Sequence, residues 1–290
     1  MTRAPVISRA RSRRILLHAV LASIAFFFAA PLLWMLATSV KPVDQAMVTP
    51  PTLLPVPASK TPAFAAENYS AVWNDPAIDF PLYFRNSLIV ATLSVIGMTL
   101  SSAVTAYGFA RMDWRGRKPL FFILLATLMI PFPVLMLPQY LIFAELGWIG
   151  SLKPLWVPAF FANAFNVFLL RQFYMTIPRE LDEAATIDGC GHWGIFWKVI
   201  FPLSRPALAV VALLQFTYTW NDFVGPLLFV AHRDQFTLAL GLQLFQSQAG
   251  FTPWNLLMAA STMVVAPVLL LFLLAERVFT RGLTAGGSRE

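Results

Sequence analysis

The sequence predicts an all-α, polytopic membrane protein with about six transmembrane helices. Hydrophobic residues make up 58% of the chain and charged residues only 12%, and the mean hydropathy is +0.68. Soluble domains carry roughly 25% charged residues, so this chain lacks the charges to cover a water-exposed surface. Its apolar residues also gather into stretches of about 20, the length of a helix that crosses the hydrocarbon core of a bilayer.

Six such stretches follow one another along the chain. They are residues 15–39, 87–110, 119–143, 152–173, 206–230 and 256–279. Four arginines between Arg9 and Arg14 precede the first stretch, as in a signal peptide. Its apolar run of about 23 residues is longer than the 7–15 apolar residues of a signal peptide, so we expect an uncleaved first transmembrane helix.

Lys and Arg lie mainly in alternate connecting segments. With a cytoplasmic N-terminus, 16 of the 21 Lys and Arg residues fall on the cytoplasmic side. Membrane proteins show this excess there, so we expect both termini in the cytoplasm. The predicted organisation is a cytoplasmic tail at 1–14, a first transmembrane helix at 15–39, a periplasmic loop at 40–86, a five-helix core domain at 87–280 that includes a cytoplasmic loop at 178–206, and a cytoplasmic tail at 281–290.

The periplasmic loop is rich in proline, which resists helix interiors. We expect an extended segment there, with a short helix near residues 65–73. Prolines also interrupt the third apolar stretch, and such breaks at membrane depth border cavities or protein. The small residues Gly97, Ser101 and Ser102 of the second stretch favour close helix packing over ligand binding.

Composition and motifs argue against an enzyme. The chain has one cysteine, Cys190, and three histidines that lie far apart in sequence, without the spacing of metal ligands. No GxxxxGK[ST] phosphate-binding loop occurs, so the chain has no such grip on ATP. The net charge of +7 is spread over several short segments rather than one patch, which disfavours nucleic-acid binding. We expect no catalytic or metal-ligating residue and no bound cofactor.

The cytoplasmic loop at 178–206 predicts two short helices with a sharp turn between them. Pro178 suits the first turn of a helix, and Gly189 can adopt the left-handed conformation that ends one. A second helix would run from about residue 192 to 200, before Pro202. One small, mostly apolar face of the first helix combines Leu181, Ala184, Ala185 and Asp188. The face suits either the approach of another protein, with Glu183 reaching a basic partner, or a helix that rests on the membrane.

The fifth apolar stretch carries a row of polar residues. Gln215, Tyr218, Thr219 and Asp222 share one helical face. At 1.5 Å per residue, Gln215 lies near the midplane and Asp222 about 24 Å from the cytoplasmic end. Charges inside a bilayer are costly and are functional candidates. The row either lines a translocation path or forms interhelical hydrogen bonds. Further candidates for the path are Asn221, Asn163 and Asn166.

The cytoplasmic loop resembles the EAA loop of the permease subunits of binding-protein-dependent ABC importers. That pattern is Glu-Ala-Ala, three residues, Gly, nine residues, Ile, one residue and Leu-Pro. Here Glu183-Ala184-Ala185 precedes Gly189 at the family spacing, while Val199 replaces Ile and Phe201-Pro202 replaces Leu-Pro. Other segments resemble the smaller permease subunit in the carbohydrate branch of the family. They are Asn86-Ser87-Leu88, residues 106–111, Gly116-Arg117, Ile130-Pro131, Pro138-Gln139-Tyr140, residues 220–223, Pro226-Leu227 and residues 282–286.

The resemblance implies an ATP-driven importer of sugars or related polyols in a bacterial inner membrane. In the family the loop is a coupling helix that transmits closure of a cytoplasmic ATPase to the pore. Implied partners are a second, homologous permease, two ATPases that bind ATP and Mg, and a periplasmic solute-binding protein. The implied coupling residues are Glu180, Glu183, Ala184, Ala185, Asp188, Gly189 and Pro202.

Two other classes stay open from the residues alone. The first is a secondary transporter driven by an ion gradient, in which Asp222 would hold a proton or a sodium ion. The second is a polytopic membrane enzyme, for which the sequence offers no paired carboxylates, no nucleophile with a base and no metal cluster.

Overall fold

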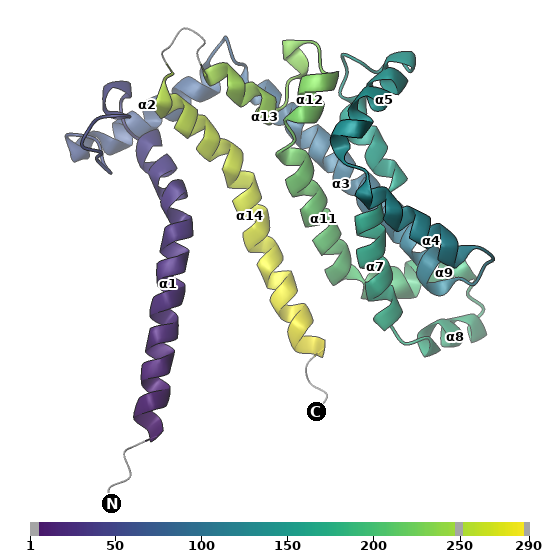
Figure 1. Cartoon of the computed structure of the whole chain (residues 1–290). Helices are drawn as coiled ribbons and strands as arrows, with labels where there is room; N and C mark the ends of the chain where they lie inside the picture. Colours follow the sequence, from purple (N-terminus) through teal and green to yellow (C-terminus); the bar gives the residue numbers. More distant parts are fainter. Residues whose placement is uncertain (1–5, 247–251, 287–290) are drawn as a thin grey trace, which may run out of the picture. The chain divides into compact units, whose positions relative to one another are not determined.

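The computed structural model describes residues 6–246 and 252–286, with side chains from 13 to 246 and from 252 to 275 (Figure 1). The described part is helical and contains no β-strand, which confirms the predicted all-α class. The ends of the two predicted tails, residues 1–5 and 287–290, lie outside the described residues. The chain forms two compact units, Met1–Pro76 with Phe245–Met263 and Ala77–Leu244 with Val264–Glu290.

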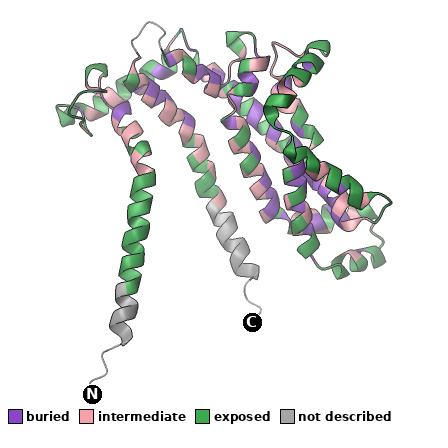
Figure 2. Ribbon diagram, in the orientation of Figure 1, coloured by how far each residue is buried: buried purple, intermediate pink, exposed green. Residues whose placement is uncertain are grey.

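The first unit contains α1 (Val6–Ser39), α2 (Thr61–Asn74) and the beginning of α14 (Trp254–Gly286). The side chains of α1 from residue 13 to 28 are exposed (Figure 2), and Phe28 is 76% exposed. Buried Asn68 of α2 donates hydrogen bonds to the carbonyl oxygens of Ser39 and Lys41, at 2.9 and 2.8 Å. Asn68 therefore fixes the chain where it leaves α1. The two short turns before α2 are η1 (Val43–Gln45) and η2 (Ala58–Lys60).

The second unit is organised around α3 (Phe80–Arg111), a continuous helix of 32 residues. It packs against α7 (Ala164–Thr176) and α11 (Arg205–Trp220), and its buried positions recur along its length (Figures 1 and 2). Short residues such as Ala103 and Ala106 are fully buried, so the neighbouring helices approach α3 closely. The core of this unit lies between these three helices.

The third apolar stretch bends sharply at its prolines. It divides into α4 (Arg117–Ala126), η3 (Thr127–Met129) and α5 (Phe132–Glu145), and the two parts meet at 100°. Pro131 has an extended backbone at the bend. The predicted interruption by proline is present at Pro131, whereas Pro138 lies inside α5 without ending it.

The fourth stretch, predicted as one helix at 152–173, is broken. It consists of α6 (Lys153–Trp156), the 3₁₀ segment η4 (Val157–Phe161) and then α7. Between η4 and α7, Ala162 has a φ of +59°, a conformation that only glycine adopts without strain. Pro158 favours the change from α6 to η4, because proline lacks the amide hydrogen that helix continuation needs. Pro154 lies in the first turn of α6, where this lack is tolerated.

The fifth stretch also differs from the single helix predicted at 206–230. Helix α11 ends at Trp220, and a separate short helix, α12 (Val224–Phe229), follows. The second helix of the cytoplasmic loop runs through α9 (His192–Ile195), the π-helical η5 (Phe196–Ile200) and α10 (Phe201–Leu203), and meets α11 at 77°. The expectation that it stops before Pro202 is wrong, because Pro202 occupies the first turn of α10, where a missing N–H is harmless.

Among residues 6–246 and 252–286, fewer than six helices are long and apolar enough to cross a membrane on their own. Three qualify in the described part: Arg13–Ser39 in α1, Phe80–Arg111 and Trp254–Ala275 in α14. The number rises to five if each bent pair counts as one span. The remaining predicted span is the broken fourth stretch, whose longest helix, α7, has 13 residues. Short segments complete the second unit and lead to α14: α13 (Leu238–Gly241), η6 (Arg233–Gln235) and η7 (Leu242–Phe245).

Candidate functional site

A cavity of about 300 Å³ lies in the second unit, between α11, α5 and the broken fourth stretch. Its volume is at the lower end of the range found for small-molecule sites. Most of its lining is apolar. The polar lining residues are Gln139, Asn163, Gln215, Tyr218, Thr219 and Asp222.

The structure brings the four residues of the predicted polar row into this one cavity. Gln215 is buried, and its amide donates a hydrogen bond to the Thr219 hydroxyl at 2.9 Å. Tyr218, on the same helix, is 66% exposed, so a solute or a partner chain can reach its side chain. The row therefore lines the cavity from buried Gln215 to exposed Tyr218.

Asp222 lies in the turn after α11 rather than inside a membrane-spanning helix. Its Oδ1 accepts a hydrogen bond from the backbone N–H of Gly225 at 3.0 Å, which holds the turn between α11 and α12. A Cβ at Gly225 would lie 2.4 Å from the other carboxylate oxygen, so a side chain there would displace the carboxylate. The carboxylate is thus fixed at the edge of the cavity by its own turn.

The opposite wall of the cavity is the irregular segment from Pro154 to Ala162. Two hydroxyls of α3 donate hydrogen bonds to its carbonyl oxygens: Ser94 to Leu155 at 3.3 Å and Ser101 to Ala159 at 3.2 Å. Backbone outside a regular helix needs such partners at membrane depth. Between these serines, a Cβ at Gly97 would lie 2.4 Å from the Phe160 ring. The predicted close packing around Gly97 and Ser101 is confirmed, and it positions a wall of the cavity.

The three predicted asparagines have different positions. Asn163 lines the cavity and also caps α7, because its Oδ1 accepts a hydrogen bond from the Asn166 N–H at 2.8 Å. Asn166 is buried and does not line the cavity. Asn221 is exposed and donates to the Thr217 carbonyl within its own helix. Of the three, the structure places only Asn163 at the cavity.

Gln139 is a lining residue that was not among the predicted candidates. It lies on α5, beside Pro138. The available signal was an isolated amide in an otherwise apolar stretch, next to a helix-breaking residue. The sequence gave no indication that Gln139 lies near α11, because about 75 residues separate it from Gln215.

The loop predicted to be cytoplasmic forms α8 (Glu180–Ile187), which lies at the end of the second unit where α3 and α7 terminate (Figure 1). Gly189 has a φ of +83°, so the left-handed turn predicted there is confirmed. The predicted small-residue face is wrong in part, since Ala185 is buried whereas Leu181 and Ala184 are exposed. The exposed face keeps Leu181, Ala184 and Asp188 of the predicted face and adds Glu180, Glu183 and Ile187.

The other side of α8 is fixed to α3. Arg111, the last residue of α3, forms an ion pair with Asp182 at 3.2 Å and donates a hydrogen bond to the Pro178 carbonyl at 3.2 Å. One turn earlier, the Tyr107 hydroxyl donates to the His192 carbonyl at 3.1 Å. Burial raises the pKa of Asp182 above its usual value, and the positive charges of Arg111 and Arg179 oppose that rise. Both α8 and α9 therefore attach to the end of α3.

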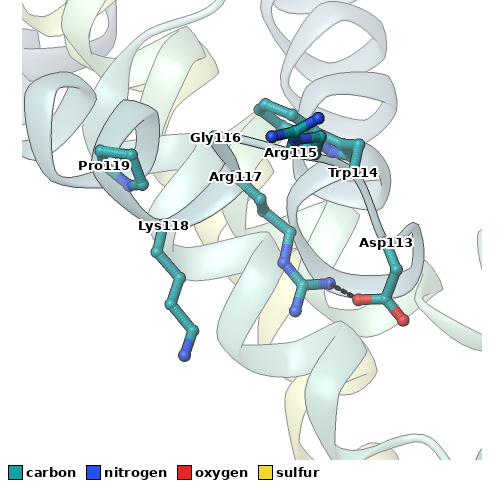
Figure 3. Close-up of a pocket in the computed structure, with 7 residues that line it drawn as sticks. All are labelled: Asp113, Trp114, Arg115, Gly116, Arg117, Lys118 and Pro119. Atoms are coloured by element: carbon teal, nitrogen blue, oxygen red, sulfur yellow. Dashed lines mark ion pairs between the residues drawn. The ribbon is translucent and has the colours of Figure 1, made fainter.

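A basic loop connects α3 to α4 near this end. Figure 3 shows the loop from Asp113 to Pro119, with the Arg117 guanidinium directed at the Asp113 carboxylate, an ion pair of 2.8 Å. Gly116 has a φ of +91° and allows the tight turn into α4. Arg115 in the loop and Lys118 in the first turn of α4 are exposed. Within the described residues, no group of three His, Cys, Asp or Glu could hold a metal ion.

These features define a class of protein. Broken apolar helices surround a largely apolar cavity that contains a row of polar residues. Outside the apolar bundle, α8 is fixed to the end of α3, a long helix of the same unit. Discontinuous helices at cavities are typical of membrane transporters. The chain has the layout of the membrane-embedded subunit of a transporter.

Comparison with known proteins identifies the family. Residues 97–284 match the family model of the binding-protein-dependent transport system inner membrane component. The chain is 35% identical to an arabinooligosaccharide transport system permease, AraQ, of Halalkalibacterium halodurans, over 92% of this chain and 93% of that protein. It is 34% identical to a trehalose/maltose transport system permease, MalG, of Thermococcus litoralis, over 94% and 96%.

A solved structure has the same fold. It is a bacterial ABC transporter involved in the import of the acidic polysaccharide alginate, with a TM-score of 0.78, 22% identity, and coverage of 96% of this chain and 99% of that chain. The chain belongs to the binding-protein-dependent inner membrane components and is a permease subunit of an ABC importer. The resemblance read from the EAA loop is confirmed, and an ATP-driven importer is favoured over a secondary transporter.

Proposed function

We propose that this chain forms half of the pore of an importer for sugars or related polyols, and that α8 is the helix through which an ATPase drives it. The observation that carries this proposal is the two-sidedness of α8. One side is held by the Arg111–Asp182 ion pair and by burial of Ala185, while Glu183 and Ile187 on the other side are exposed. Ile187 is 87% exposed and gives that free side an apolar side chain that a partner can cover.

Helix α3 offers a direct route from α8 to the cavity. Arg111 at its end contacts Asp182, and Ser94 and Ser101 further along contact the cavity wall. All these contacts involve one continuous helix, whose internal hydrogen bonds make it stiff. Movement of α8 would therefore displace the wall formed by Pro154 to Ala162 and change access to the cavity.

The assembly around this chain follows from its family. A binding-protein-dependent system needs a solute-binding protein, and we propose that it lies on the periplasmic side. We further propose a second, homologous permease that completes the pore and two ATPases that bind ATP and Mg, while this chain binds no cofactor. We also propose that both termini lie in the cytoplasm, and the excess of Lys and Arg in the segments expected on that side, 16 of 21, supports this orientation.

The cavity lining suits polyhydroxyl solutes. The amides of Gln139 and Asn163 and the phenol of Tyr218 can both donate and accept hydrogen bonds, as sugar hydroxyls do. Apolar surface such as Phe132 can pack against the carbon faces of a sugar ring. The relatives named for arabinooligosaccharides and for trehalose and maltose support the same substrate class.

A charge reversal on α8 tests the proposed coupling. We expect Glu183→Arg to lower uptake and binding-protein-stimulated ATP hydrolysis by about tenfold or more in the reconstituted complex, because losing a charged contact and introducing repulsion costs several kcal/mol. The matched control is Glu145→Arg, the same charge change at the exposed end of α5. Normal coupling in Glu183→Arg, in a complex that assembles normally, would overturn the proposal.

A further inference from the structure

On the basis of the function proposed above, we propose that the cavity admits uncharged polyhydroxyl solutes and rejects anionic ones, and that Asp222 sets this charge preference. The family does not settle this question. One solved importer of the same fold takes up an acidic polysaccharide, whereas two relatives carry the names of oligosaccharide or disaccharide systems. The charge preference must therefore come from the lining of this particular chain.

The lining contains one charged residue and no cation. Of the sixteen residues that line the cavity, ten are apolar or glycine, five are uncharged and polar, and the sixteenth is Asp222. Lys, Arg and His are absent from this set, all of which belongs to the described residues. Lys153 precedes the lining residue Pro154 in the chain, but it is exposed and does not line the cavity.

An anion in this cavity would lose its hydration without gaining a cationic partner. The desolvation of a carboxylate or phosphate costs several kcal/mol unless charge-assisted hydrogen bonds replace the water. Proteins that bind carboxylates and phosphates supply Arg or Lys for this purpose. Here the solute would meet the Asp222 carboxylate, which repels it in a largely apolar surrounding.

The local structure holds Asp222 in this position. Its Oδ1 accepts the hydrogen bond from the Gly225 N–H, and the absence of a side chain at Gly225 leaves room for Oδ2. The carboxylate cannot turn away without losing that bond. Substitution by Asn preserves an oxygen for the same hydrogen bond and removes only the charge, so Asp222→Asn isolates the electrostatic effect.

A cysteine in the cavity measures the charge preference without knowledge of the substrate. Because Cys190 is the chain's one cysteine, Cys190→Ser gives a background free of native thiols in this chain. Thr219→Cys then places a thiol of similar size in the cavity. In the reconstituted complex, the rates of modification by neutral, cationic and anionic methanethiosulfonates of similar size are measured from the mass of this chain. The control is Asn221→Cys, two residues away, exposed and outside the cavity lining.

At each position, the rate of the cationic reagent is divided by the rate of the anionic reagent. We expect this ratio to be about tenfold larger at position 219 than at position 221. Adding Asp222→Asn should make the cationic-to-anionic rate ratio nearly equal at the two positions. Equal rates for both ions at position 219, with the neutral reagent reacting readily, would overturn the charge preference and leave the translocation path intact. If no reagent reached position 219 in any nucleotide state while position 221 reacted, the proposed path itself would fail.

Discussion

Helix α3 and the segment that runs from α6 to α7 pack against each other in the second unit, yet their backbones differ completely. Over its 32 residues, α3 forms a regular helix that satisfies its backbone groups internally. The segment from Lys153 to Thr176 changes from α-helix to 3₁₀ helix, passes through Ala162 at a positive φ and becomes helical again. The regular helix supplies stiffness, and the irregular segment supplies the cavity wall.

The difference shows where an irregular wall gets its stability. Carbonyl oxygens that a continuous helix would have bonded internally accept hydrogen bonds from Ser94 and Ser101 of α3. The absence of a side chain at Gly97 admits the Phe160 ring. The wall therefore depends on α3, and changes in α3 should affect the wall more than the helix itself.

The largest effect is expected at the end of α3, where it holds α8. Arg111→Gln removes the partner of Asp182 and should lower stability by about 2 kcal/mol, since an ionic hydrogen bond at a largely buried site is lost. A lower midpoint of thermal unfolding of the purified complex and a fall in coupled ATP hydrolysis would show it. The double variant Arg111→Asp, Asp182→Arg should recover part of the lost stability and part of the lost coupled ATP hydrolysis. An Arg111→Gln complex with unchanged stability and coupling would contradict the assigned contact.

A smaller effect is expected where α3 meets the wall. Gly97→Ala brings a methyl group into the Phe160 ring and should cost about 1–2 kcal/mol as the wall repacks. Gly108→Ala on the same helix is the matched control, because nothing lies within 4 Å of the added Cβ. That change should be neutral or stabilising, since Ala favours helix over Gly. The two variants are compared by thermal unfolding and by uptake, and equal behaviour would count against a tight contact at Gly97.

The smallest effect is expected from the loss of one hydroxyl. Ser101→Ala removes the hydrogen bond to the Ala159 carbonyl and should cost about 1 kcal/mol. Ser23→Ala is a suitable control, since that hydroxyl bonds only to a carbonyl of its own helix. Access of a reagent to the cavity should rise in Ser101→Ala and stay constant in the control. If access does not change, the wall does not need this bond.

Local signals in the sequence predict much of the molecule. The apolar stretches, the turn at Gly189 and the polar row on α11 all follow from residue spacing and the conformational preferences of single residues. Pairs that are distant in sequence could not be predicted. Arg111 and Asp182 are 71 residues apart, and nothing in either segment indicates the other.

The broken stretches show a second limit. Residues 152–173 are apolar enough to suggest one helix, although Pro154, Pro158 and Asn163 all disfavour it. Their effect depends on whether another helix offers partners to the backbone groups that a break exposes. Ser94 and Ser101 provide those partners, and they belong to a different stretch. In the same way, the position of Asp222 in a turn depends on Gly225, three residues later.

The most direct measurement is the response of the cavity to the ATPase in the assembled complex. The rate at which a neutral thiol reagent modifies Cys190→Ser, Thr219→Cys is compared with and without a trapped ATP analogue. If α3 transmits movement from α8 to the cavity wall, the rate changes with nucleotide, the change disappears in Arg111→Gln, and it returns when Arg111 and Asp182 exchange charges. A nucleotide-dependent change of the same size in Arg111→Gln would contradict the transmission through α3.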